Sequence, residues 1–123
     1  MILELPLPPS VNRIWQMASG MGVYRTKEYI AWRKECDGLC MLYRWHKTPI
    51  VGRFIVEIVL NEKQPNRGDC DNRIKAILDF LHSTGITEDD RYCQKVSAEW
   101  GEAPAGCRVT ITAADAGRVD PDG

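Results

Sequence analysis

The run from Phe54 to Leu60 constrains the fold of this chain more than any other stretch. Six of its seven residues are apolar and four are β-branched, a composition typical of a strand inside a sheet. We therefore expect a central strand over residues 54–60 with both of its faces mostly buried. Other elements of the chain must supply that cover.

Two amphipathic segments are long enough to be helices that pack on this sheet. The first has Thr26 as a good N-cap and runs to about Lys47. Its apolar residues recur at spacings of three and four: Tyr29, Trp32, Cys36, Leu39 or Cys40, and Tyr43. Its other face, which would either line a polyanion or be solvated, carries Lys27, Arg33, Lys34, Arg44 and Lys47.

The second helix is predicted over residues 71–84, after a polar loop at residues 61–68. Asp71 is a suitable N-cap, and Gly85 suits the left-handed conformation that ends many helices. Lys75 lies about one turn after Asp71, on the side away from the core. The apolar face of this helix comprises Ile74, Ile77, Leu78 and Leu81.

Three further strands are predicted, at residues 2–5, 92–100 and 107–112, the last two as a hairpin. An irregular loop is expected from Ser10 to about Tyr24. The fold class is therefore α+β: a single domain with a mixed sheet and two main helices in β-α-β-α-β-β order. We expect this domain to span residues 1–112, and the small, polar and acidic residues 113–123 to form a flexible tail.

The cysteines limit the classes of function. There are five, with no Cys-x-x-Cys pair, and His46 and His82 lie near none of them at zinc-site spacing. We expect neither a zinc finger nor a disulfide framework, and we interpret the cysteines as small buried apolar residues. No apolar run approaches the ~20 residues that a bilayer requires, and no signal sequence is evident. We therefore expect a cytoplasmic protein without membrane contact.

The net charge of −1 conceals an uneven distribution. Between Ser10 and Lys75 there are twelve Lys and Arg residues against seven Asp and Glu residues. Much of the compensating acid lies at residues 88–90 and in the tail. A basic surface around an acidic pocket is compatible with this distribution, and so is a solvated basic face.

Four carboxylates flank the second helix. If residues 69–71 are extended, Asp69 and Asp71 point to the same side. Such like charges are unfavourable together unless a cation, a proton or a hydrogen-bond donor compensates them. Asp89 and Asp90 follow the helix, and either can approach the first pair only if the chain folds back along it. Helix capping would account for Asp71 but not for Asp69.

Carboxylate ligands prefer hard cations such as Mg²⁺ or Mn²⁺, which commonly act on phosphate groups. With a phosphodiester substrate, such an ion lowers the pKa of a bound water molecule, and Lys75 would stabilise charge that develops on the phosphate. Arg13 and Trp15 are candidates to contact a phosphate and a base, but the sequence favours Trp15 as a residue that covers an edge of the core. A metal-free acidic surface turn would also account for the carboxylates.

The motif Asp69-x-Asp71-Asn72-x-x-Lys75 is followed by Asp89-Asp90 and preceded by Leu7-Pro8-Pro9-Ser10-Val11-Asn12. In this order the chain resembles the RusA family of Holliday junction resolvases, from its first strand to its last. The resemblance implies a homodimeric, Mg²⁺-dependent endodeoxyribonuclease, often prophage-borne, that nicks two opposed strands of a four-way DNA junction. It also implies that Asp69, Asp71 and Asp90 are catalytic metal ligands and that Lys75 is the catalytic lysine.

The chain departs from the family pattern at three places, none of them a catalytic position. Cys70 stands where Leu is usual, Gly68 where a basic residue is common, and Arg91-Tyr92 where a small residue often follows the Asp-Asp pair. We expect DNA contacts from six polar or basic residues: Asn12, Arg13, Arg25, Lys27, Arg67 and Arg73. Three other functions fit parts of the pattern, namely a nuclease for other branched DNA, a catalytically silent junction-binding protein, and an interaction domain unrelated to nucleic acid. The matched carboxylates and Lys75 favour the enzyme.

Overall fold

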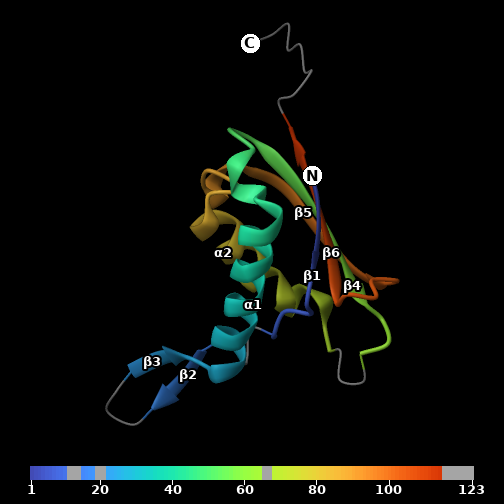
Figure 1. Ribbon diagram of the computed structural model, residues 1–123. Coiled ribbons are helices and arrows are strands. Elements are labelled where there is room, and N and C mark those ends of the chain that lie inside the picture. Colours follow the sequence, from blue (N-terminus) through green and yellow to red (C-terminus); the bar gives the residue numbers. More distant parts are fainter. Residues whose placement is uncertain (11–14, 19–21, 65–67, 115–123) are drawn as a thin grey trace, which may run out of the picture.

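The computed structural model describes residues 1–10, 15–18, 22–64 and 68–114. Its main elements are β1 (Ile2–Leu5), β2 (Trp15–Ala18), β3 (Gly22–Arg25), α1 (Lys27–Tyr43), β4 (Phe54–Asn61), α2 (Ile74–Thr84), β5 (Cys93–Gly101) and β6 (Cys107–Ala113). Short 3₁₀ helices lie at Trp45–Lys47 (η2), Cys70–Arg73 (η3) and Asp90–Tyr92 (η4). Four strands form a mixed sheet in the order β1-β6-β4-β5, with α1 and α2 packed on one face (Figure 1). The predicted α+β class is confirmed.

The strand β4 is central, as predicted, but only one of its faces is fully buried. It pairs in parallel with β5 and antiparallel with β6. Phe54, Val56, Ile58 and Leu60 are buried, whereas Glu57 between them is exposed. The expectation that both faces are mostly buried is therefore wrong, because both helices lie on the same side of the sheet.

Two predictions about connections are also wrong. β5 and β6 do not form a hairpin, since β4 lies between them and pairs with both. Their connection passes over the end of β4, where Asn61 N donates to Gly106 O at 2.9 Å and Glu62 N donates to Gly101 O at 2.9 Å. The region expected to be an irregular loop contains an antiparallel hairpin of β2 and β3, so the predicted element order lacks two strands.

The helix α1 begins where predicted and ends earlier. Thr26 Oγ1 accepts a hydrogen bond from Tyr29 N at 3.3 Å, which confirms the cap. Arg44 adopts a left-handed conformation with φ 59° and ends the helix, so the residues up to Lys47 form η2 instead. Tyr43, predicted to face the sheet, is 62% exposed. The rest of the predicted stripe is buried or half-buried: Tyr29, Trp32, Cys36, Leu39 and Cys40.

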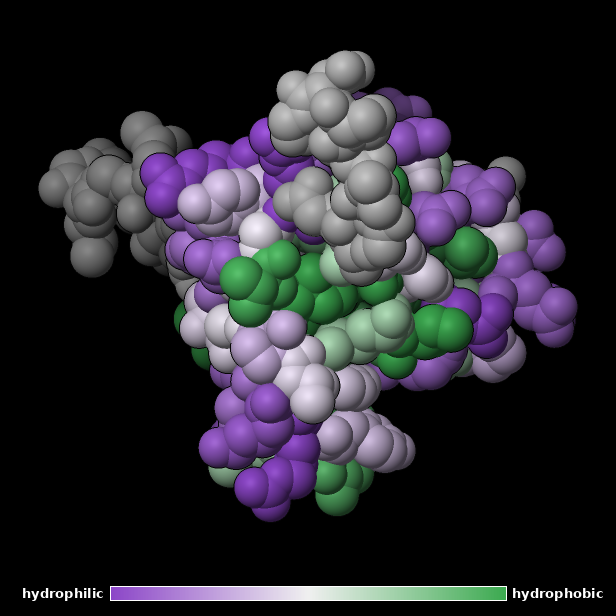
Figure 2. Space-filling model, turned by 90° about the horizontal axis from the view of Figure 1, so that it is seen from above, coloured by the Kyte–Doolittle hydropathy of each residue, from purple (hydrophilic) through white to green (hydrophobic). Residues whose placement is uncertain are grey.

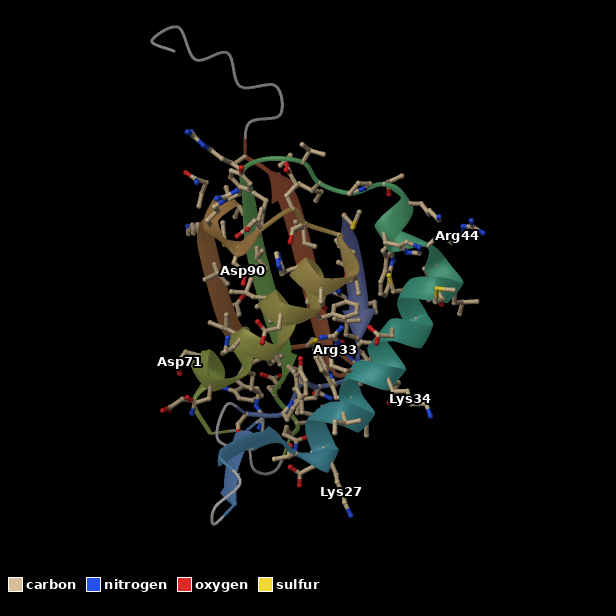
Figure 3. The ribbon with its side chains drawn as sticks, turned by 90° about the vertical axis from the view of Figure 1, so that its left-hand side faces the viewer. Lys27, Arg33, Lys34, Arg44, Asp71 and Asp90 are labelled. Carbon is tan, nitrogen blue, oxygen red and sulfur yellow. The ribbon has the colours of Figure 1, made fainter. Side chains whose placement is uncertain are left out.

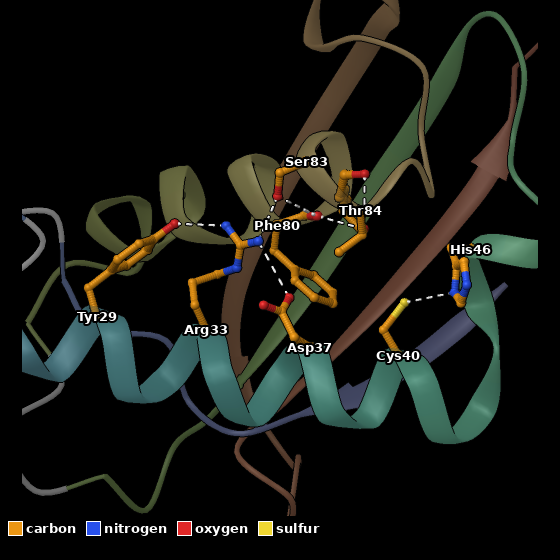
Figure 4. A network of polar contacts seen from close by, with 9 residues as sticks. Tyr29, Arg33, Asp37, Cys40, His46, Phe80, Ser83 and Thr84 are labelled. Carbon is orange, nitrogen blue, oxygen red and sulfur yellow. Dashed lines mark hydrogen bonds and ion pairs between the residues drawn. The ribbon is translucent and has the colours of Figure 1, made fainter.

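Arg33 joins the two helices instead of facing solvent (Figure 4). Its guanidinium donates to Ser83 Oγ on α2 at 2.7 Å and to Tyr29 Oη on α1 at 3.2 Å. It also donates to Asp37 Oδ1 at 3.4 Å and lies 5.6 Å from the centre of the Phe80 ring. Arg33 is thus part of the packing between α1 and α2, and it is not available to line a polyanion.

Apolar side chains are exposed at the end of the molecule where β1 begins and α1 ends. They are Ile2, Met41, Leu42, Tyr43 and Val51, each more than half exposed. Figure 2 looks down on this end and shows hydrophobic surface in the middle of a largely hydrophilic face. Among the described residues, no helix combines the length and the apolar character that crossing a membrane would require.

All five cysteines are free, and three of them, Cys36, Cys40 and Cys107, are buried as predicted. Burial raises the pKa of the Cys107 thiol to about 12, and Glu4 contributes to the same direction. Cys70 and Cys93 are only partly buried, and Cys70 belongs to the site described below.

Replacing either of two glycines by alanine should change the free energy of unfolding, in opposite directions. Gly106 has φ +134°, and a Cβ there would collide with the backbone of Leu7 and lie 2.7 Å from Pro6 C, so Gly106→Ala should lower the free energy of unfolding by about 1–3 kcal/mol. Gly38 lies inside α1 with open space around its Cα, so Gly38→Ala should raise it by up to ~1 kcal/mol. Urea denaturation measures both, and equal effects would contradict this account.

The Arg33 network predicts that Arg33→Met destabilises the protein. The methionine keeps a stem over Phe80 but removes the donors to Ser83 and Tyr29, at a cost of about 1–3 kcal/mol. Lys34→Met, on the neighbouring exposed position, should change stability by no more than ~0.5 kcal/mol. Thermal and urea unfolding of the two variants test this, and similar losses in both would refute the assignment.

Candidate active site

The carboxylates Asp69 and Asp71 lie at the entrance to α2, where the backbone changes from extended to helical. Asp69 is extended, with φ −83° and ψ 134°, but Cys70–Arg73 winds into η3, closed by Asn72 N donating to Asp69 O at 3.2 Å. The extended conformation expected for residues 69–71 is therefore found at Asp69 only. Both carboxylates are nevertheless exposed and line one hollow of about 550 Å³, together with Gly68, Cys70 and Trp100.

The predicted capping role of Asp71 is wrong. Asp69 occupies the cap position of η3, and its side chain makes no capping hydrogen bond. Asp71 lies inside the first turn, and α2 itself starts only at Ile74. Within the described part of the chain, neither carboxylate has a hydrogen bond or an ion pair, so capping accounts for neither of them. The C-terminal prediction for α2 is confirmed, since Gly85 is left-handed with φ 82°.

Buried contacts hold η3 against the sheet and so fix the position of the two carboxylates. Cys70 Sγ donates to Ala98 O on β5 at 3.3 Å. Arg73 Nη1 donates to Pro8 O at 2.6 Å, and its guanidinium lies 5.7 Å from the centre of the Trp100 ring. The segment with the functional motif is thereby tied to the strand β5 and to the segment that follows β1.

The inward position of Arg73 does not fit its predicted role as a DNA contact. The residue is only 8% exposed and directs its guanidinium inward, so it supports the site and does not reach a phosphate. Lys27 is exposed at the start of α1, as a DNA contact must be. Asn12, Arg13 and Arg67 lie outside the described residues, and so does the side chain of Arg25.

The second pair of carboxylates divides into two different roles. Asp89 caps η4, since its Oδ1 accepts from Arg91 N at 3.0 Å and its Oδ2 lies 3.8 Å from Arg91 Nε. Asp90 is exposed and makes neither contact. Partial desolvation raises the pKa of the Asp90 carboxyl above its ordinary value, although the positive charge of His82 opposes this effect; Asp79 and Asp89 raise it further and Lys75 lowers it.

The structure brings Asp69 and Asp71 together but does not bring Asp90 to them. The chain after α2 does turn back, with Thr87 N donating to Leu81 O at 3.2 Å, and this places Asp90 within electrostatic range of Asp79 and Lys75. No cluster of three or more His, Cys, Asp or Glu side chains suitable for a metal occurs among the described residues. The three predicted ligands therefore do not converge in the single chain.

The first pair does fit a hard cation chemically, because it offers exposed carboxylate oxygens that the described residues do not neutralise. Lys75, predicted to lie beside Asp71, is exposed on α2, and its ion pair is with Asp79 Oδ1 at 3.5 Å. Asp79 and His82 also belong to the surroundings of Asp90, and the sequence motif contains neither of them. The spacing of four residues from Lys75 to Asp79 is the signal that would have found Asp79.

Two exposed carboxylates in one hollow, followed by a helix with an exposed lysine, thus lie on a mixed sheet with a crossover helix. A family model described as endodeoxyribonuclease RusA matches residues 6–112, and the chain belongs to this family. The crossover junction endodeoxyribonuclease rusA of Enterobacteria phage HK97 is 28% identical over 109 residues, which cover 87% of this chain and 88% of the phage protein. The matched region contains every catalytic candidate from Asp69 to Asp90.

The environment of Asp90 predicts a pH-dependent effect on stability. A carboxyl with a raised pKa in the folded state stabilises the fold only when protonated, so this contribution is lost as the pH rises through the folded pKa. Asp90→Asn should therefore be at least as thermostable as the wild type at pH 7. The difference should disappear below the ordinary Asp pKa of about 3.9. Melting temperatures of both proteins, measured without divalent metal at pH 7 and at low pH, test this. The account is contradicted if the variant loses stability relative to the wild type when the pH is raised to 7.

Proposed function

We propose that this protein is a Mg²⁺-dependent endodeoxyribonuclease that resolves four-way DNA junctions by paired nicks, with Mn²⁺ as a possible substitute. The observation that carries this proposal is the Asp69–Asp71 pair, exposed in one hollow at the start of α2 in a chain of the RusA family. A structural role does not account for two adjacent carboxylates that lack neutralising partners among the described residues. A bound cation together with a phosphodiester substrate accounts for the two carboxylates.

The chain's own residues have distinct tasks in this proposal. Asp69 and Asp71 hold the cation, and Asp90 completes the catalytic set from the far end of α2. Lys75 stabilises the negative charge that develops on the scissile phosphate, because its ammonium is exposed on the helix that directly follows the segment with Asp71. Bound Mg²⁺ supplies charge neutralisation and a water molecule of lowered pKa. Hydrolysis leaves a 5′-phosphate and a 3′-hydroxyl.

In the single chain, Asp71 and Asp90 do not belong to a group of three or more side chains that could hold a metal, among the described residues. Figure 3 shows both residues on the same side of the molecule, with α2 beside them. Apo geometry of this kind is common where catalytic contacts tighten only with substrate. We infer that Asp71 and Asp90 reach their final arrangement only in the complex with the junction.

DNA contacts in this proposal come from Asn12, Arg13, Arg25, Lys27 and Arg67. Lys27 lies at the end of α1 that is nearer to Asp71, whereas Lys34 and Arg44 point to the side of the molecule away from both Asp71 and Asp90 (Figure 3). Contacts to phosphates should make binding fall steeply with salt. We further propose a homodimer in the cytoplasm, because twofold symmetry places two equal sites on opposed strands.

Asp71→Asn tests the proposed function. It should lower the rate of junction cleavage in Mg²⁺ by about a hundredfold or more. Loss of a residue that only hydrogen-bonds to a metal ligand already costs roughly 10–100-fold, and Asp71 is proposed as a ligand itself. The matched control is Asp37→Asn on α1, a carboxylate far from the motif in sequence, which should cleave like the wild type. Labelled four-way junction, flap, single strand and linear duplex are compared. Cleavage of flaps in preference to junctions would favour a nuclease for other branched DNA. Binding of the junction without cleavage would favour a catalytically silent junction-binding protein.

A further inference from the structure

Asp79 is the one acidic residue of α2 beyond the RusA motif, and it is paired with the catalytic lysine. Its Oδ1 lies 3.5 Å from Lys75 Nζ. The Asp79 side chain is 23% exposed and the Lys75 side chain 55% exposed. The carboxylate is therefore the better fixed member of the pair, and the ammonium is the more accessible one.

The pair lies between the two groups of catalytic carboxylates. Lys75 and Asp79 are four residues apart on α2 and share one of its faces, and Asp71 precedes the helix in η3. Asp90 lies within electrostatic range of both Lys75 and Asp79. An ammonium on a flexible four-carbon stem can be directed toward either end of this face, and an anchor decides which way it points.

An ordinary solvated ion pair does not account for this arrangement. Such a pair has both members exposed and contributes only a few tenths of a kcal/mol on a helix surface. Asp79 is instead half-buried and adds negative charge to the surroundings of Asp90, which is unfavourable for folding. The matched i,i+4 pair of Arg33 and Asp37 on α1 has an exposed carboxylate, with Asp37 51% exposed, and lacks this conflict.

We propose that Asp79 is a positioning residue that holds the ammonium of Lys75 toward the scissile phosphate. It acts through Lys75 and touches neither cation nor DNA. Loss of the carboxylate leaves the lysine present but free to sample other rotamers, which lowers the rate of the chemical step without weakening the binding of the junction. The inference rests on the proposed function, because it assigns a partner to the lysine of that site.

The experiment separates chemistry from binding. Single-turnover cleavage of a four-way junction is measured at saturating protein in Mg²⁺, and the junction Kd is measured with Ca²⁺ in place of Mg²⁺. The variants are Asp79→Asn, Asp79→Ser, Asp79→Glu, Lys75→Gln and the double variant Asp79→Asn with Lys75→Gln. Asp37→Asn, which breaks the comparable pair on α1, is the control, and thermal melts confirm that each variant is folded.

Asp79→Asn and Asp79→Ser should lower the cleavage rate roughly ten- to a hundredfold with an unchanged Kd, and Asp37→Asn should leave the rate unchanged. Asp79→Glu should recover most of the rate, because a glutamate still reaches a lysine one turn away. The double variant should be no slower than Lys75→Gln alone, as expected for two residues that act as a unit.

Several results would overturn the inference. Losses that multiply in the double variant, or a Kd that weakens in proportion to the rate, would show that Asp79 does not act through Lys75. A shifted Mg²⁺ midpoint in Asp79→Asn would make it a metal ligand. An Asp79→Asn protein that cleaves like the wild type refutes this inference alone, whereas a wild type that cleaves no junction refutes the proposed function as well.

Discussion

The parallel pairing of β4 with β5 is the constraint on which the rest of the structure depends. Two parallel strands cannot be joined by a tight turn, so the chain must cross over the sheet between them, and here it does so through α2. The crossover begins near the end of β4 and ends before the start of β5. Its two ends therefore lie near opposite ends of these two strands, and each of them carries one pair of the aspartates.

This topology also explains why so much of the site is held by long-range contacts. The segment with Asp69 and Asp71 must be fixed against a strand that comes later in the chain, and Cys70 supplies that contact through Ala98 O. At the other end, Ile50 N donates to Ile86 O at 2.8 Å and Gly52 N donates to Glu88 Oε1 at 2.7 Å. The loop before β4 thus fixes the loop that leads to Asp90.

The sequence predicted those features that local patterning controls. The β-branched run of β4, the cap at Thr26 and the left-handed Gly85 depend on neighbouring residues, and each element or cap was found where expected. The partners of β5 and β6 depend on the crossover, which no turn residue specifies, so the predicted hairpin was wrong. The same holds for Arg33 and Arg73. Side-chain type indicated a solvated or DNA-facing cation, whereas packing between distant elements buries Arg73 and leaves Arg33 partly buried.

The candidate site shows the same division. The motif identified the carboxylates and the lysine, but the spacing along the chain could not show how far apart Asp71 and Asp90 lie, since this distance depends on where the chain turns after Leu81. The motif does not include Asp79. Its link to Lys75 is a contact in the folded protein, and no known functional pattern of residue types contains it. Family membership extends over residues 6–112 and so includes both ends of the crossover.

The eleven residues of α2 form a rigid rod of about 16 Å whose middle packs on the sheet through Ile77, Phe80 and Leu81. Both ends of this helix are held as well, because Cys70 Sγ donates to Ala98 O just before it and Arg33 donates to Ser83 Oγ in its last turn. The helix is therefore a spacer of fixed length between the segment with Asp71 and the segment with Asp90. Adding or removing one residue within α2 would rotate one segment relative to the other by about 100°.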